Sequence, residues 1–315
     1  MLSRVADSIY WINRYVERAE NVSRFVEVNL HLLLDTPMGS MQQWEPLVIT
    51  TGDQDIFKER YGEATAENVL KFLTFDADYP SSIRSCVKSA RENARSVREI
   101  ISSEMWEQLN EFYLQVEDAA KSTDIAQLYA FYPEVKTASH LFAGVMEATM
   151  SHNEGWHFGR LGRFLERADK TARILDVKYF ILLPSIAAVG SPLDNLQWIA
   201  LLRSASAYEM YRKCQHMINP SGIVEFLVLH PEFPRSIRCS ILQAEQSLNK
   251  ISGSPMGSWQ LTSERRLGKL RSQLDYITLE EIFQTGLHEF LDQLQKDLNQ
   301  VGNTITENFF GSVPA

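Results

Sequence analysis

The chain of 315 residues is 44% hydrophobic and 23% charged, and it carries a formal net charge of −9. This composition is ordinary for a folded protein and excludes disordered, collagen-like and low-complexity chains. The acidic balance also argues against a broad nucleic-acid-binding surface, which depends on clustered lysine and arginine.

The first predicted element is a long amphipathic helix at the N-terminus. Small and apolar residues recur every three or four positions from Ile9 to Leu33, which predicts a helix over about 3–34. Pro37 and Gly39 then predict its end.

The rest of the chain also has helical periodicity. Pro80 and Ser82 mark the start of a helix that runs to about 101. No segment alternates with period two, and glycine (15) and proline (11) are scarce, so we predict an all-α fold. The other expected helices lie near 53–60, 64–75, 103–119, 134–151 and 154–182, and then, after a loop at 184–192, near 193–216, 220–229, 234–251, 259–275 and 279–303.

The sequence also bears on the compartment. No stretch reaches the roughly 18 apolar residues of a membrane span, and the best candidate, 179–189, is interrupted by Pro184. The N-terminus lacks the basic region and apolar run of a signal peptide. Cys86, Cys214 and Cys239 have neither zinc-ligand nor disulfide spacing. We therefore expect a cytoplasmic protein without a membrane partner or a cofactor.

Two segments of the chain are repeated. Residues 14–24, RYVERAENVSR, reappear at 163–173 as RFLERADKTAR, a shift of 149, and residues 69–84 reappear at 223–238 with a shift of 154. The simplest account is a single domain, 1–315, built from two duplicated helical halves, about 1–130 and 150–300. We expect a pseudo-twofold axis to relate these halves in one compact bundle.

The positions that both copies retain are mostly polar: Arg14 and Arg163, Glu17 and Glu166, Arg18 and Arg167, and Arg24 and Arg173. Three hypotheses remain open. The retained residues form a solvated face whose pairs contribute only ~0.2–0.5 kcal/mol each, a buried structural network where two faces meet, or a polar cleft that binds a ligand or partner. In the cleft, the arginines would bind, and Glu17 and Glu166 would be the candidate catalytic residues.

The repeated helix starts at Pro80 and Pro234 are a second candidate site. A helix N-terminus presents free N–H groups, and Arg84 or Arg238, one turn inside, would complete an anion pocket. Arg91 lies seven residues beyond Arg84, on the same face. The alternative is simple capping by proline and serine.

Metal chemistry is a third candidate, although we expect no metal. Glu154 and His157 have the Glu-x-x-His spacing of carboxylate-bridged di-iron bundles. A second such motif is missing, and the repeat equivalents are Val5 and Ser8. His152 and Glu147 lie close enough in sequence for a mononuclear site.

Two stretches carry a resemblance to a known family. Residues 1–21, which include Tyr10-Trp11 and Glu17-Arg18-Ala19-Glu20-Asn21, and residues 140–168, which include Gly159-Arg160-Leu161-Gly162, resemble the signatures of the bacterial alpha-E family. The resemblance implies an all-helical protein encoded beside a circularly permuted ATP-grasp protein, often with a transglutaminase-like peptidase, and sometimes fused to the former. The family offers no established catalytic residues.

These neighbouring proteins imply a peptide-ligating or peptide-modifying system. Because the sequence has no phosphate-binding glycine-rich loop, we expect a binding or accessory subunit whose partner is the ATP-grasp protein. The alternative is an enzyme that uses the duplicated Arg/Glu face as an acid–base cleft in amide or peptide chemistry.

Overall fold

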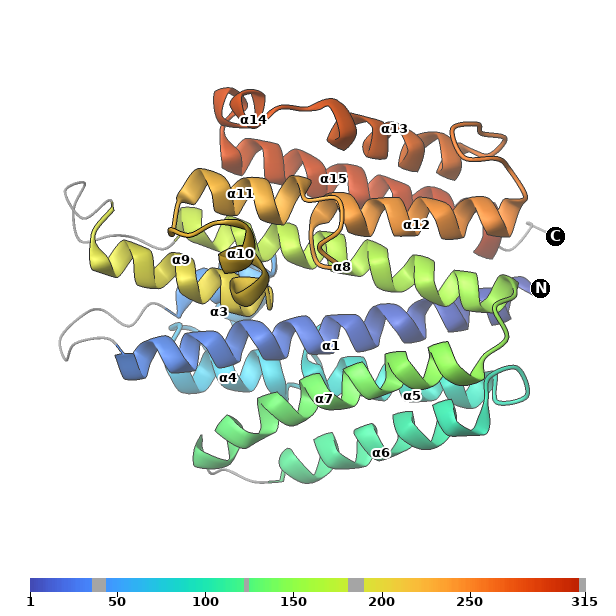
Figure 1. Cartoon of the computed structure of the whole chain (residues 1–315). Helices are drawn as coiled ribbons and strands as arrows, with labels where there is room; N and C mark the ends of the chain where they lie inside the picture. Colours follow the sequence, from blue (N-terminus) through green and yellow to red (C-terminus); the bar gives the residue numbers. More distant parts are fainter. Residues whose placement is uncertain (36–43, 122–124, 181–189, 312–315) are drawn as a thin grey trace.

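A computed structural model of the chain describes residues 1–35, 44–121, 125–180 and 190–311. Within these ranges all regular structure is helical, which confirms the all-α prediction. Figure 1 shows the helices side by side in layers, with α1 (Ser3–Asp35) and α8 (Glu154–Phe180) through the middle. None of the described helices is long and apolar enough to cross a membrane.

The two halves of the chain each contribute one of the central helices. After α1, the first half contains α2 (Glu45–Ile49), α3 (Gln54–Tyr61), α4 (Ala66–Thr74), α5 (Ile83–Ser96), α6 (Ser103–Ala119) and α7 (Ile125–Thr149). After α8, the second half contains α9 (Pro192–Ser204), α10 (Tyr208–Cys214), α11 (Pro220–Leu229), α12 (Ile237–Ser252), α13 (Thr262–Tyr276), α14 (Leu279–Thr285), α15 (Leu287–Ile305) and the π-helical turn η2 (Thr306–Phe310). The helices α5 and α7 pack on α1, and α12 and α15 pack on α8, while α9 also packs on α1 and α2 on α8.

Most predicted helices are present, but two are divided and one was missed. The segment 193–216 breaks into α9 and α10 at Ser206, whose φ of 49° is left-handed, and the segment 279–303 breaks at Gly286, whose φ is 95°. A residue in this region cannot continue a right-handed helix. The short α2 was not predicted, because five residues are too few to show a helical period.

Other boundaries also differ. The helix expected to run to about 101 ends at Ser96, since the backbone turns from Val97 onward. α7 begins nine residues earlier than expected and continues through Pro133. The predicted helix end at Pro37 and Gly39, and the break at Pro184, lie outside the described residues.

Glycines bring α8 close to α1. A Cβ added to Gly162 would overlap the carbonyl oxygen of Tyr10, and one added to Gly159 would overlap the side chain of Asn13. These glycines lie three residues apart on one face of α8. Only glycine allows the two helix backbones to approach this closely.

The apolar core is divided into two clusters, one for each half of the chain. One cluster gathers residues between Val5 and Trp156, and the other gathers residues from Phe158 to Ile305 together with Ala6 and Tyr10. The contact between α1 and α8 therefore lies where the two clusters meet.

Several repeated positions have similar local structure. Ser82 and Ser236, which the shift of 154 relates, are the N-caps of α5 and α12 and accept hydrogen bonds from Ser85 N and Cys239 N. Gly52 and Ser206, also related by that shift, both have positive φ. These features fit a duplication, which stays a hypothesis.

Candidate functional site

The polar faces of α1 and α8 meet in the interior, and we call this contact the seam. Glu166 of α8 is fully buried and accepts hydrogen bonds from two arginines of α1. Arg14 Nε lies 2.8 Å from its Oε2. Arg18 donates from Nε to Oε1 at 2.7 Å and from Nη2 to Oε2 at 3.1 Å, the bidentate geometry of strong Arg–carboxylate pairs.

Glu17 of α1 has the reciprocal arrangement. Arg167 of α8 donates from Nε to Oε1 at 2.9 Å and from Nη2 to Oε2 at 2.7 Å. Arg235 Nη1 and Asn21 Nδ2 donate to the same Oε1 at 3.2 and 2.9 Å. The retained residues of one segment thus pair with those of the other, which is the geometry of a buried network rather than of a solvated face.

A second pair of carboxylates extends the network on the side of α7. Glu20 Oε1 accepts from Arg24 Nη2 at 2.7 Å and also from Arg235. His140 Nε2 of α7 lies 3.0 Å from that oxygen. Arg24 also donates to the hydroxyl of Ser206 at the α9–α10 break.

Asp169 has the equivalent position on α8. Arg173 Nε and Lys170 Nζ each lie 3.0 Å from its Oδ2. Arg173 Nη1 donates to the carbonyl oxygens of Thr50 and Thr51 at 2.9 and 3.2 Å, beyond the end of α2. Each end of the seam is therefore tied to a loop of the other half.

The network sets the protonation of its carboxyls. Burial alone would raise the pKa of Glu166, but Arg18 and Arg14 outweigh it and hold that pKa well below its ordinary value. The pKa of Glu17 is lowered because Arg167 and Arg235 likewise outweigh the effect of burial. Carboxylates that stay ionised in this way are poor proton carriers near neutral pH. The geometry therefore favours a structural role for both candidate catalytic residues.

Arg163, unlike its repeat counterpart Arg14, has no carboxylate partner among the described residues. Its Nε is buried without a hydrogen-bond partner, and its guanidinium lies 4.9 Å from the ring centroid of Phe164. Burial and the neighbouring Arg167 lower the pKa of Arg163 to about 10. It remains a cation at neutral pH, uncompensated by an ion pair.

The arginines at the helix starts are all engaged. Arg84 forms a bidentate pair with Glu117 at 2.7 and 2.8 Å, and Arg238 Nε lies 2.9 Å from Asp275 Oδ1. Arg91 Nε donates to Asn110 Oδ1 at 2.8 Å. Together with the serine N-caps, these contacts favour the capping interpretation over an anion pocket.

The residues considered for a metal ion do not form a common site. Glu154 pairs with the amino group of Met1 at 2.8 Å. His152 Nε2 is 3.9 Å from Glu147 Oε1, and burial lowers the pKa of His157. In the described part of the chain, no three His, Cys, Asp or Glu side chains gather in a way that could hold a metal ion.

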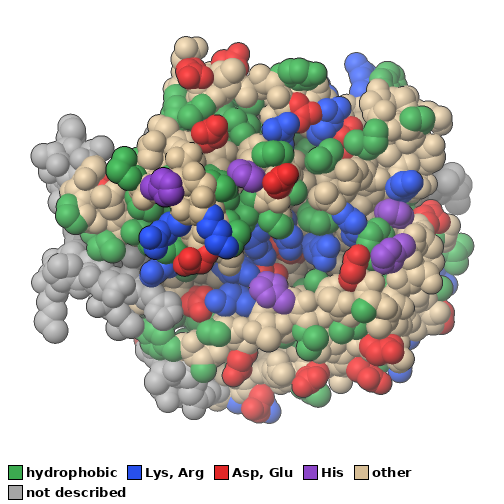
Figure 2. All heavy atoms as spheres, in the orientation of Figure 1, with side chains coloured by type: hydrophobic (Ala, Val, Ile, Leu, Met, Phe, Trp, Pro, Cys, Tyr) green, Lys and Arg blue, Asp and Glu red, His purple; other side chains and the backbone are tan. Residues whose placement is uncertain are grey.

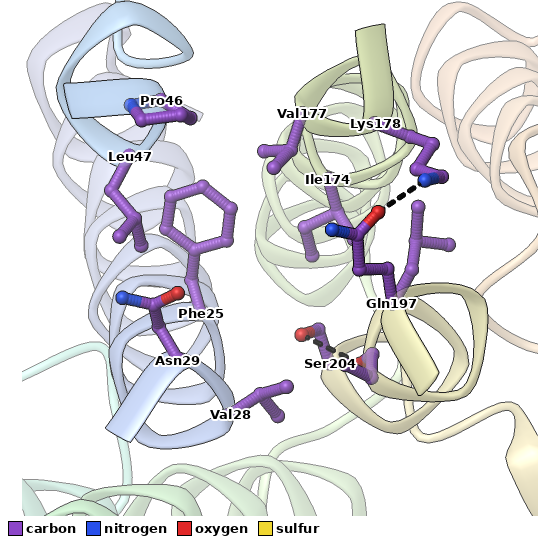
Figure 3. Close-up of a pocket in the computed structure, with 12 residues that line it drawn as sticks. Phe25, Val28, Asn29, Pro46, Leu47, Ile174, Val177, Lys178, Gln197 and Ser204 are labelled. Carbon is purple, nitrogen blue, oxygen red and sulfur yellow. Dashed lines mark hydrogen bonds between the residues drawn. The ribbon is translucent and has the colours of Figure 1, made fainter. Parts of the chain in front are cut away.

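Two cavities border the seam. One lies between α1, α2, α8 and α9, where Phe25 and Leu47 face Ile174 and Val177 (Figure 3). The other is more polar, with Arg18, Lys170 and Arg173 among its lining residues. Phe25 and Ile174 line both, so the cavities adjoin.

Sequence reasoning missed Arg235, Glu20 and His140. Arg235 differs from its repeat equivalent, Ser81, so a search for retained positions passed over it. His140 belongs to α7, which lies outside the two retained segments and their copies. The spacing of Glu20 and Arg24, four residues apart on one helix, is the signal that could have placed this pair.

The surface reflects the excess of cations at the seam. Figure 2 shows Lys and Arg side chains in a hollow at the middle of one face, where α8 and α1 lie in Figure 1. More cations than carboxylates belong to the network: Arg14, Arg18, Arg24, Arg167, Lys170, Arg173 and Arg235 against Glu17, Glu20, Glu166 and Asp169.

The sequence matches the model of a known family. The Alpha-E family model, described as a predicted alpha-helical domain with a conserved ER motif, matches residues 1–310. Uncharacterised proteins of Mycobacterium bovis and of two strains of Mycobacterium tuberculosis are each 23% identical, over 96% of this chain and 36% of theirs. The chain thus spans little more than a third of the length of these relatives. No solved structure matches.

The Glu-Arg dipeptides 17–18 and 166–167 lie at the centre of the seam, where both carboxylates are enclosed by arginines. Since the family model covers nearly the whole length, this chain belongs to the Alpha-E family.

Proposed function

We propose that this protein is a binding or accessory subunit of a cytoplasmic peptide-ligating or peptide-modifying system, and that it works with a circularly permuted ATP-grasp protein. The observation that carries the proposal is the state of Glu17 and Glu166. Each carboxylate is buried and occupied by two arginines. This supports a structural role for the two glutamates rather than a reaction centre.

The length of the relatives supports this partnership. Because the chain accounts for 36% of each mycobacterial relative, the remainder of those proteins has room for a further domain. This agrees with the expectation that the alpha-E domain is sometimes fused to the ATP-grasp protein. A transglutaminase-like peptidase is a further candidate partner.

The alternative, an acid–base enzyme using Glu17 and Glu166, needs a carboxyl that exchanges protons near neutral pH. The arginines lower both pKa values instead. No contact in the seam favours this alternative.

The test is co-expression of the chain with the ATP-grasp protein encoded beside it. We expect the two to co-elute in size-exclusion chromatography, and the chain to change the rate of ATP hydrolysis by its partner. Separate elution together with unchanged ATP turnover would contradict the proposal.

Seam variants refine this experiment. Glu17→Gln and Glu166→Gln should weaken the complex in proportion to the stability that they lose, because the seam acts as a scaffold. If both variants kept the stability and the complex of the unmodified chain, the scaffold role of these glutamates would have to be abandoned.

A further inference from the structure

The two ends of the seam differ in how their arginines are used. On one end, Arg14 and Arg18 both bind Glu166. On the other end, Arg167 binds Glu17, but Arg163, which the repeat relates to Arg14, does not. If the two ends were symmetric, Arg163 would bind Glu17 as Arg14 binds Glu166.

Arg235 explains the difference. Its Nη1 lies 3.2 Å from Glu17 Oε1, and its other nitrogen binds Glu20. The repeat places Ser81 at the equivalent position, where the short side chain carries no charge for Glu166 and accepts a bond from Arg18 at 3.5 Å. Arg235 therefore supplies the second cation to Glu17. Arg163 is left without a carboxylate partner among the described residues.

The surroundings of Arg163 are cationic and aromatic. Arg160, one turn earlier on α8, also has a buried Nε without a partner, and its guanidinium lies 4.7 Å from the ring centroid of Trp156 and 5.2 Å from that of Phe164. Arg167 lies 5.4 Å from the Phe164 centroid. Rings on one side of guanidinium groups fix their planes and leave the N–H edges to other acceptors.

We propose that Arg163 and Arg160 form an oxyanion-binding site on α8, which takes the carboxylate or phosphate group of a small ligand. Both groups present oxygens with the spacing of a guanidinium fork. Both arginines are partly exposed. The site goes beyond the proposed partnership, since the chain alone would bind the anion.

A bound oxyanion would satisfy hydrogen-bond donors that have no partner within the fold. It would accept hydrogen bonds from the two unpartnered Nε groups and offset the charge of a partly buried cation. A buried donor without an acceptor carries an unfavourable desolvation free energy, which ligand binding removes. Glu17 does not fill this place, since its carboxylate binds Arg167 and Arg235 and the buried Nε of Arg163 has no hydrogen-bond partner.

The test is isothermal titration of the purified chain with sodium phosphate and, separately, with N-acetylglutamate, at constant ionic strength set with sodium chloride. We expect saturable binding of at least one probe, and the stronger probe identifies the ligand class. Arg163→Gln should weaken that binding at least tenfold without lowering the midpoint of urea unfolding, because Arg163 has no ion pair to lose.

Two variants serve as controls. Arg14→Gln, at the equivalent repeat position, should lower the unfolding midpoint because it breaks the bond to Glu166, and should leave anion affinity within twofold. Arg95→Gln removes an exposed arginine of α5 and should change neither quantity. The site would be ruled out if neither probe saturates, or if Arg95→Gln weakens binding as much as Arg163→Gln.

Discussion

Glu17 and Glu166 illustrate what single residues contribute to this molecule. Their identity in both repeats, beside arginines three residues before and one after, made a buried Arg/Glu network where two faces meet one of three hypotheses. The pattern could not say which arginine binds which carboxylate. That choice depends on Arg235, which enters the seam from the loop before α12 and has no charged counterpart in the other copy.

Neutralising one buried carboxylate should be costly. Glu166→Gln leaves Arg14 and Arg18 without a counter-charge in the interior, so we expect the free energy of unfolding to fall by about 3–5 kcal/mol. Glu117→Gln, which breaks the half-exposed pair with Arg84, should lose at most about 1 kcal/mol. Urea denaturation of both variants measures the difference. Equal losses would show that the seam is no stronger than a surface pair.

The seam also predicts how stability depends on pH. Burial opposes ionisation of Asp169, but Lys170 and Arg173 outweigh it and lower its pKa to about 2. Between the unfolded value of about 3.9 and that value, the unfolded chain binds a proton that the folded chain does not. The stabilisation is therefore complete above about pH 4 and is lost as the pH falls towards 2.

Asp169→Asn tests this dependence. The variant should be less stable than the unmodified chain by about 2 kcal/mol at pH 7, and the difference should shrink as the pH approaches 2. Denaturation by urea at several pH values measures it. Asp118→Asn, at an exposed position, should follow the unmodified chain throughout. A gap for Asp169→Asn that stays constant with pH would mean that its charge is not responsible.

At the scale of elements, periodicity predicted long helices well and their interruptions poorly. α1, α6 and α11 begin and end within a residue or two of their predicted bounds. The breaks at Ser206 and Gly286 depend on single backbone angles, and a serine carries no sequence signal for positive φ. The prediction for α7 erred in the opposite sense, because the expected helix, 134–151, begins directly after Pro133, whereas α7 continues through this proline.

The close approach of α1 and α8 depends on small side chains. Gly162→Ala would place a methyl group against the Tyr10 carbonyl oxygen, which is backbone and cannot rotate away. We expect the free energy of unfolding to fall by about 1–3 kcal/mol, the usual cost of overpacking. Thermal or urea unfolding of the variant measures this change.

Gly144 provides the matched control for that substitution. It also lies within a helix, α7, but a Cβ there would meet nothing within 4 Å. Gly144→Ala should therefore raise stability by up to about 1 kcal/mol, through helix propensity alone. If both glycine variants gained stability, the two helices would not be in the tight contact described.

For the whole molecule, the sequence predicted an all-α fold, which the structure confirms, and it offered the meeting of two similar segments as one hypothesis. It could not predict that the apolar core is divided along this meeting. That division arises because α1 and α8 each direct an apolar stripe to their own cluster and a polar face to the other helix. A hydrophobic period identifies the stripe of a helix but not the neighbour that covers its other face.

The excess of arginine and lysine at the seam also changes how the net charge of −9 is distributed. Because the network is cationic, the rest of the chain must carry a negative charge greater in magnitude than the total. At physiological salt, electrostatic fields decay over about 8 Å, so an approaching ion responds to the charges of the nearest part of the surface. A small anion that enters the hollow comes within this distance of the seam arginines, where the potential is positive. The local potential at the seam therefore differs in sign from the net charge of the whole chain.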